Sequence, residues 1–115
     1  MKESLSPRER IRKKKDFLIL YKKGSRYRGK YFNLVFLPNN QTYSRMAVVV
    51  GKRVGNAVKR NKIKRWMRAL YRRNKDLLEI PLDMIFLTKE EIAEASWAGL
   101  GEEYCSVLGA VCRKL

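Results

Sequence analysis

The sequence has no histidine and only two cysteines among its 115 residues. Cys105 and Cys112 stand seven positions apart, so neither a disulfide framework nor a zinc site has the ligands that it requires, and we expect two buried thiols. The acidic residues are scattered, without paired carboxylates at metal-ligand spacing, and isolated ones such as Asp16 and Asp76 fit helix-end charges. The sequence therefore predicts no catalytic residue and no metal site in the polypeptide itself.

Long hydrophobic runs are also absent. No stretch approaches the roughly 18 consecutive apolar residues of a membrane span, and the basic N-terminus lacks the apolar segment of a signal peptide, so we expect a cytoplasmic protein. There is no internal repeat. The length and the hydrophobic content of 45% suffice for one domain with a single core over residues 1–115, of which residues 1–9 are expected to be frayed.

Charge is abundant and unevenly placed. The net charge is +16, but residues 1–75 hold 24 Lys and Arg against 3 Asp and Glu, whereas residues 76–115 hold 3 against 8. A merely soluble surface needs a net charge of only about 2 to 8 with both signs interspersed. The first two thirds of the chain therefore indicate a surface for a polyanion, which attracts phosphate backbones without choosing a sequence.

Hydrophobic spacing in the first half predicts one helix and two strands. An amphipathic helix is expected from Ile11 to Tyr21, ending at Gly24. Residues 26–30 form a connector or a short strand. Residues 31–37 and 46–50 are rich in β-branched and aromatic side chains and flank a Pro-Asn-Asn turn, which predicts an antiparallel hairpin.

A second helix is expected from Asn56, a capping residue, to about Asn74. One stripe of this helix is apolar and set to face the core, because its members recur at intervals of three and four: Ile63, Trp66, Met67 and Leu70. At about 100° per residue the opposite side is basic, with Arg60, Lys64, Arg65, Arg68 and Arg72. One face of the helix can then bind the core and the other RNA.

The last third of the chain is expected to be scaffold. Pro81 precedes a buried strand at residues 84–87, and residues 88–91 form a capping-box pattern that starts a turn of helix. A final helix follows, with Glu102 and Glu103 pointing outward. Its apolar face comprises Leu100, Tyr104, Val107, Leu108 and Val111, with the two cysteines at the edge.

The run from Gly51 to Arg65 joins a strand end, a glycine-bearing loop and a basic helix N-terminus. Glycines allow close approach of the backbone, and the free N–H groups at a helix start favour phosphate. Charge around them comes from Lys52, Arg53, Lys59 and Arg60. A nucleotide-binding P-loop is the competing interpretation, but the order G-x-x-x-x-G-K-[ST] that it requires is absent.

This run resembles the signature of the bacterial ribonuclease P protein component, in which a Lys-Lys/Arg-x-Gly-Asn-Ala-Val segment precedes a helix with an Arg-Asn-Arg-x-x-Arg core. The matching core here is Arg60-Asn61-Lys62-Ile63-Lys64-Arg65. Lys62 replaces the usual arginine, which keeps the charge but loses the planar fork. The likeness also covers residues 10–17, Tyr21 and Gly24, and it extends over the element order of the whole chain.

The resemblance implies an α+β fold, an α/β sandwich with a mixed central sheet, about three helices and a left-handed β-α-β crossover, although such crossovers are right-handed in about 98% of cases. It implies the protein subunit of ribonuclease P, which removes the 5′ leader of precursor tRNA, with chemistry by magnesium ions held mainly in the RNA subunit. The implied partners are that catalytic RNA, facing the basic helix and loop, and precursor tRNA, with neither a membrane nor DNA. A cleft between the first helix and the sheet would take the leader.

The candidate RNA-binding residues are Arg12, Phe17, Tyr21, Lys52, Arg53, Asn56, Lys59, Arg60, Asn61, Lys62, Lys64, Arg65 and Arg68. Phe17 and Tyr21 share a helix face and are either a stacking platform for bases or ordinary core. Two sets of strand residues alternate, and either one can face the cleft: Tyr31, Asn33 and Val35, or Phe32, Leu34 and Phe36. Two other functions fit the charge, a ribosomal or general RNA-binding structural protein and a metal-dependent nuclease acting alone.

Overall fold

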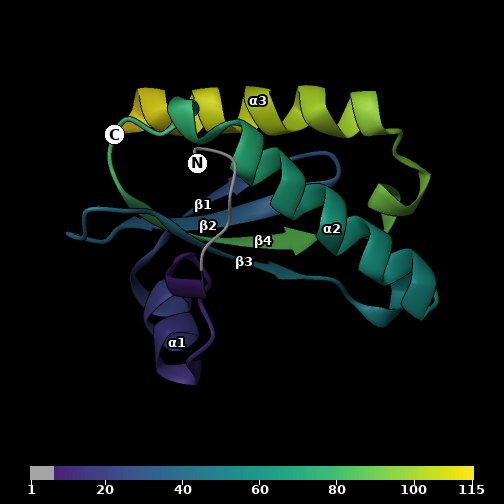
Figure 1. The fold of residues 1–115 in the computed structure, drawn as a ribbon, viewed down its shortest axis with the longest axis horizontal. Coiled ribbons are helices and arrows are strands. Elements are labelled where there is room, and N and C mark those ends of the chain that lie inside the picture. Colours follow the sequence, from purple (N-terminus) through teal and green to yellow (C-terminus); the bar gives the residue numbers. More distant parts are fainter. Residues whose placement is uncertain (1–6) are drawn as a thin grey trace.

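A four-stranded sheet lies between two layers of helix in the computed structural model, which describes residues 7–115 (Figure 1). Helices α2 and α3 cover one face of the sheet and α1 covers the other. The helices are α1 (Lys14–Lys23), α2 (Ala57–Arg73) and α3 (Trp97–Lys114), and the strands are β1 (Ser25–Arg28), β2 (Phe32–Pro38), β3 (Arg45–Val49) and β4 (Leu82–Thr88). Short 3-10 turns are η1 (Pro7–Glu9), η2 (Lys52–Val54), η3 (Lys75–Leu77) and η4 (Glu90–Glu94). This arrangement confirms the expected α+β fold.

The strand order β1-β2-β4-β3 overturns the predicted hairpin. β2 and β3 do not pair with each other, because β4 lies between them, antiparallel to β2 and parallel to β3. The physical reason is burial: β4 is buried at every position from Leu82 to Phe86, and a strand that is covered on both faces belongs in the centre of a sheet. β3, α2 and β4 thus form the β-α-β crossover, and the connector after α1 becomes the edge strand β1.

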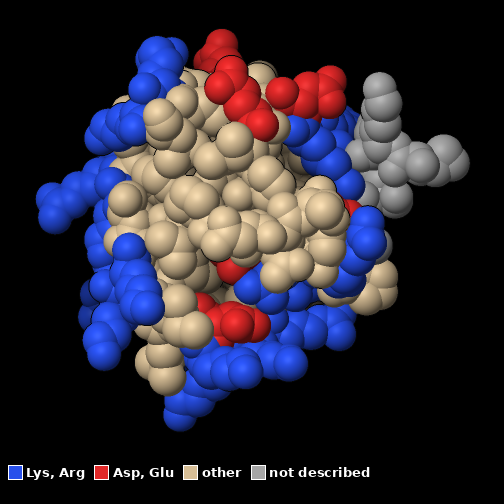
Figure 2. Space-filling view, turned by 90° about the vertical axis from the view of Figure 1, so that its left-hand side faces the viewer, with Lys and Arg blue, Asp and Glu red and all other residues tan. Residues whose placement is uncertain are grey.

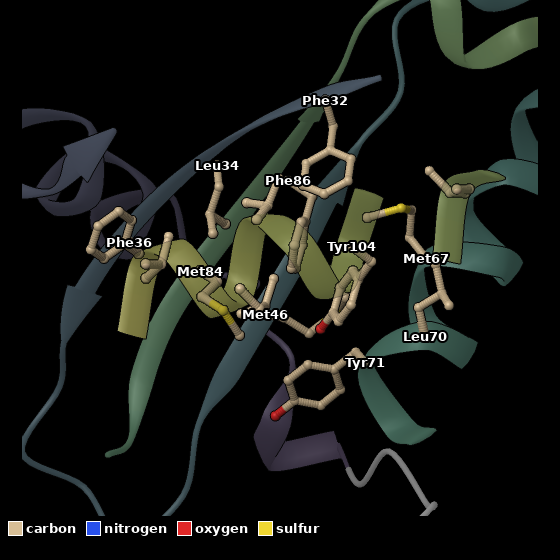
Figure 3. Close-up of a cluster of buried hydrophobic side chains, with 14 of the residues drawn as sticks. Phe32, Leu34, Phe36, Met46, Met67, Leu70, Tyr71, Met84, Phe86 and Tyr104 are labelled. Atoms are coloured by element: carbon tan, nitrogen blue, oxygen red, sulfur yellow. The ribbon is translucent and has the colours of Figure 1, made fainter. Parts of the chain in front are cut away.

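The alternation of β2 divides its side chains between two cores. Phe32, Leu34 and Phe36 point to the face under α2 and α3 and join the larger cluster (Figure 3). Val35 points to the opposite face, where it packs with Leu20 of α1. The large core is aromatic at its centre, since Phe86 stacks on Tyr104 of α3 at 5.6 Å between ring centroids. The even-numbered residues of β2 therefore belong to the large core, and Val35 belongs to the small core under α1.

The N-terminal segment differs from the prediction of frayed residues. Residues 1–6 lie outside the described part, but Pro7–Glu9 form a turn in which Glu9 is only 7% exposed. Helix α1 begins at Lys14 rather than near Ile11. Ile11 instead donates its backbone N–H to the Met46 carbonyl at 3.0 Å and is buried, so the segment adds to the edge of β3.

Two smaller predictions are also corrected. Cys105 is exposed and Cys112 half-buried, because both lie beside the apolar stripe of α3 rather than on it, and the thiol of Cys112 contacts the carbonyl of Leu77 at 3.0 Å. Thr88 does not cap the following turn, because its hydroxyl donates to the carbonyl of Val49 at 3.0 Å across the sheet. The turn itself forms, as η4.

Candidate nucleic-acid interface

The start of α2 has the geometry that the sequence predicts. The side-chain oxygen of Asn56 accepts from the backbone N–H of Lys59 at 3.0 Å and caps the helix. Gly55 just before it has φ of 155°, and a Cβ there would meet the side chain of Lys59 at 3.0 Å. Lys52 and Arg53 are exposed on the preceding turn. The loop therefore presents backbone and charge together, as phosphate binding requires.

The basic residues of α2 are spread more widely around the helix than predicted. Arg65 is exposed, away from the core, as expected, and so is Asn61. Arg60 precedes Ile63 by three positions, about 60° around the helix, so it lies on the flank of the core rather than opposite it. Its Nε atom is buried without a hydrogen-bond partner in the described structure. Arg60, Lys64 and Arg68 thus form a half-buried flank, which we call the cleft flank.

A cavity of about 180 Å³ lies where this flank, α1, β3 and the N-terminal segment meet. It brings two predicted residues near the N-terminus, Arg12 and Phe17, together with Arg68, which is distant in the sequence. Ile11, Met46, Ala47 and Val48 line it as well.

Arg10 also lines this cavity, although it was not among the predicted site residues. Its signal was the alternation of residues 9–12, in which Glu9 and Ile11 are buried and the two arginines are exposed. Burial and the positive charge of Arg10 lower the pKa of Arg68. Crowded like charges of this kind are relieved by an anion, so the cavity suits a phosphate group.

Phe17 and Tyr21 remain neighbours, with ring centroids 6.4 Å apart, but they differ in exposure. Phe17 is half-buried and packs against the small core around Val35, whereas Tyr21 is 37% exposed and has the guanidinium of Arg26 6.0 Å from its ring centroid. Neither a pure core role nor a fully open platform describes the pair.

The strand aromatics take no part in this platform. Phe32 and Phe36 are buried on the other face of the sheet, and Tyr31 packs against the larger core. Asn33 and Val35 therefore belong to the face that α1 covers. Of the two alternating sets of strand residues, the odd-numbered one is thus on the side of the cleft.

An ionic cluster holds the start of α1 against the sheet. Arg45 of β3 donates two hydrogen bonds to Asp83 of β4, at 2.9 and 2.5 Å, and a third to Asp16 of α1 at 3.4 Å. Asn39 donates to the same carboxylate of Asp83 at 2.8 Å. The hydrogen bonds with Asp83 raise the pKa of Arg45. Asp16 is thus a charge at the start of α1, as predicted, and it joins this helix to β3.

Positive charge dominates one view of the surface. Figure 2 shows blue side chains along the left and lower edges, and red ones gathered at the upper edge, with a second small red group in the lower middle. Within residues 7–115 no group of three or more candidate ligands could hold a metal ion. No helix in this described part is long and apolar enough to cross a membrane.

The fold and this surface define a small α+β protein with a basic surface that attracts polyanions. A family model described as ribonuclease P matches residues 5–111. A protein of Thermotoga maritima named ribonuclease P protein component is 38% identical over 94 residues, which cover 82% of this chain and 80% of that protein. One of the same name from Syntrophus aciditrophicus is 35% identical over 113 residues, covering 98% and 92%. The chain belongs to the ribonuclease P protein family.

Solved structures agree with this assignment. The RNase P protein from Thermotoga maritima superposes with a TM-score of 0.81 at 32% identity, covering 89% of this chain and 96% of that one. The RNase P protein of Staphylococcus aureus superposes with a TM-score of 0.83 at 29% identity, covering 90% of this chain and 94% of that one. The arrangement of layers described above is therefore that of the family.

Proposed function

We propose that the chain is the protein subunit of ribonuclease P and supports tRNA 5′-end maturation by binding two RNAs. The loop before α2 and the exposed side of that helix bind the catalytic RNA. The cavity between α1 and α2 binds the 5′ leader of precursor tRNA. The observation that carries the proposal is the meeting of Arg12, Phe17 and Arg68 in one cavity, in a chain of this family.

In this proposal the cavity holds a strand through its backbone and its bases at once. Arg10, Arg12 and Arg68 neutralise phosphates, and Arg68 in particular is half-buried, where a charge-assisted hydrogen bond is stronger than in water. Phe17 and Tyr21 offer rings to the bases. Stacking on rings tolerates every base, which suits leaders of different sequence.

The protein supplies binding, and magnesium ions held mainly by the RNA subunit supply the chemistry of phosphodiester hydrolysis. Within the described residues the carboxylates nearest the cavity are engaged by cations: Asp16 by Arg45, and Glu9 by Lys75. The role of the protein is therefore to increase the affinity of the holoenzyme for its substrate and to hold the substrate in position.

A cleavage assay tests the proposal. Precursor tRNA is incubated with the chain alone, with ribonuclease P RNA alone at low magnesium, and with both. We expect 5′-leader removal only in the third mixture. Cleavage by the chain alone would indicate a nuclease, and an inactive mixture despite RNA binding would favour a ribosomal or general RNA-binding protein.

A further inference from the structure

Helix α2 has a third side, which lies outside the cleft flank and packs only partly against the core. Lys62, Trp66 and Arg73 recur at intervals of four and seven, so they share one stripe. Trp66 lies two positions before Arg68, about 200° around the helix, so this stripe faces away from the arginine cavity. It meets the start of α3, where Trp97 packs on Trp66.

Four side chains, two rings between two cations, form a cluster that we call the tryptophan ladder: Lys62, Trp66, Trp97 and Arg73. The indole rings of Trp66 and Trp97 meet edge to face, with centroids 5.5 Å apart and 68° between the planes. The ammonium of Lys62 lies 4.6 Å from the Trp66 ring centroid, and the guanidinium of Arg73 lies 5.4 Å from that of Trp97. A cation therefore stands at each end of an aromatic pair.

Two observations distinguish the ladder from a simple contact between helices. Trp97 remains 36% exposed, although a tryptophan that only joins two helices would be covered. Lys62 also lines an open groove at the helix start, together with Asn56, Lys59 and Glu94. The ladder is thus continuous with the loop that presents backbone and charge to phosphate, and Lys62 and Lys59 outnumber the one carboxylate of this groove.

We propose that the tryptophan ladder is a second RNA contact, in which an unpaired base of the catalytic RNA stacks on Trp97 beside Arg73 while Lys62 meets a flanking phosphate. Aromatic rings interleaved with cations are the arrangement that binds unpaired nucleotides. The leader strand is a poorer occupant, because the cavity that suits it lies on the other side of α2. The inference rests on the proposed function and extends the RNA contact from α2 to the start of α3.

Intrinsic fluorescence reports on this site directly, because Trp66 and Trp97 are the two tryptophans of the whole sequence. The unmodified chain is titrated with ribonuclease P RNA and, separately, with a single-stranded leader oligonucleotide. We expect the RNA subunit to quench the emission and the leader oligonucleotide to leave it unchanged. A Trp66→Phe variant, which retains only Trp97 as emitter, should show the same quenching.

Affinity provides the second measurement. Trp97→Leu keeps an apolar contact with Trp66 but removes the stacking surface, so it should weaken binding of ribonuclease P RNA by about 5- to 150-fold, the range of one base–aromatic stack. The matched control is Tyr27→Leu, which removes a cation–aromatic pair with Lys114 at the other end of α3 (5.3 Å). The control should retain full affinity.

The outcomes separate this inference from the function on which it rests. Unquenched emission together with full affinity of Trp97→Leu would overturn the ladder as an RNA contact while leaving the proposed function in place. Quenching by the leader oligonucleotide instead of the RNA subunit would overturn the assignment of the occupant. A parent chain that does not bind ribonuclease P RNA would overturn both proposals.

Discussion

The hydroxyl of Tyr71 donates a hydrogen bond to the carboxylate of Glu9 at 2.9 Å, although the two residues are 62 positions apart. Both are buried, and Lys75 approaches the same carboxylate at 2.9 Å. The carbonyl of Ser44 lies 3.1 Å from the hydroxyl. This cluster anchors the N-terminal segment beside α2, immediately before Arg10 and Arg12, which line the cavity.

Tyr71→Phe should therefore destabilise the protein. The change removes the hydroxyl and leaves a buried carboxylate with fewer donors, which costs about 1 to 3 kcal/mol. Denaturant unfolding gives the free energy, and Tyr21→Phe, in which the hydroxyl belongs to an exposed ring, is the matched control. Equal stability of the two variants would show that the hydrogen bond contributes nothing.

Alkaline pH should destabilise the fold through two tyrosines. Burial raises the pKa of Tyr71 and of Tyr104 above the ordinary value of 10.0. The hydrogen bond to Glu9 raises the pKa of Tyr71 further. The folded state then keeps protons that the unfolded chain loses. Stability is therefore fully retained below about pH 10 and falls above it, by about 1.4 kcal/mol per pH unit for each phenol.

Unfolding free energies between pH 8 and about pH 11.5 measure this effect, with tyrosinate absorbance as the second signal. Above about pH 10, Tyr71→Phe should reduce the slope of the unfolding free energy against pH by about 1.4 kcal/mol per pH unit, the contribution of one phenol. If the absorbance of all six tyrosines rises in one step near pH 10 while the protein stays folded, the burial argument is wrong.

Loss of both rings from α1 should weaken binding of the leader. Phe17→Leu/Tyr21→Leu keeps apolar volume in the small core but removes the stacking surfaces, each worth about 1 to 3 kcal/mol per base. In the holoenzyme the variant should lose affinity for precursor tRNA with a 5′ leader and bind mature tRNA as before. The control is Leu18→Ala, an exposed apolar residue on the same helix.

Dissociation constants with and without the leader, alongside a melting curve, decide this prediction. Equal losses for the two tRNAs, with a lowered melting temperature, would assign both rings to the core. The family assignment would be unaffected by that result.

Charge removal from α2 should reduce the salt dependence of RNA binding. Lys64→Gln/Arg65→Gln should lower the slope of log affinity against log salt by about 0.7 to 0.9 per lost phosphate contact, with little loss of stability. Arg113→Gln/Lys114→Gln makes the same change in net charge at the end of α3 and should leave the slope nearly unchanged. Parallel slopes for all three proteins would contradict the assignment of α2 to phosphate.

The stripe of α3 from Leu100 onward is expected to act on stability alone. Leu108 is fully buried, so Leu108→Ala should cost about 2 to 5 kcal/mol, with Ser106→Ala as an exposed control. The affinity of the folded fraction for RNA should not change. A weakened affinity at unchanged stability would place this stripe in the RNA contact instead.

Local patterns in the sequence predicted what depends on local structure. Asn56 caps α2, and Ile63, Met67 and Leu70 are buried as their spacing indicates. Trp66 shares that spacing but is only partly buried, because it turns toward Trp97. The family resemblance supplied the mixed sheet and the crossover, which periodicity alone does not determine.

Features that depend on distant contacts were missed or misread. The predicted hairpin was wrong because the turn between β2 and β3 does not reveal that β4, which comes later in the sequence, lies between them. Arg10 was missed because its place in the cavity depends on Glu9 reaching Tyr71. Arg60 was predicted opposite the apolar stripe, but the helical period puts it only about 60° from Ile63, and its buried Nε atom agrees with a place on the flank of the core.

The central position of β4 constrains how the protein is synthesised. A nascent chain of about 80 residues already carries nearly all of the basic charge, yet it lacks the strand that joins β2 to β3. Such a chain offers its lysines and arginines to any nearby RNA, the ribosome included, before it can form its sheet. The basic residues can therefore form a folded binding surface only after the acidic last third, which contains β4, has been synthesised.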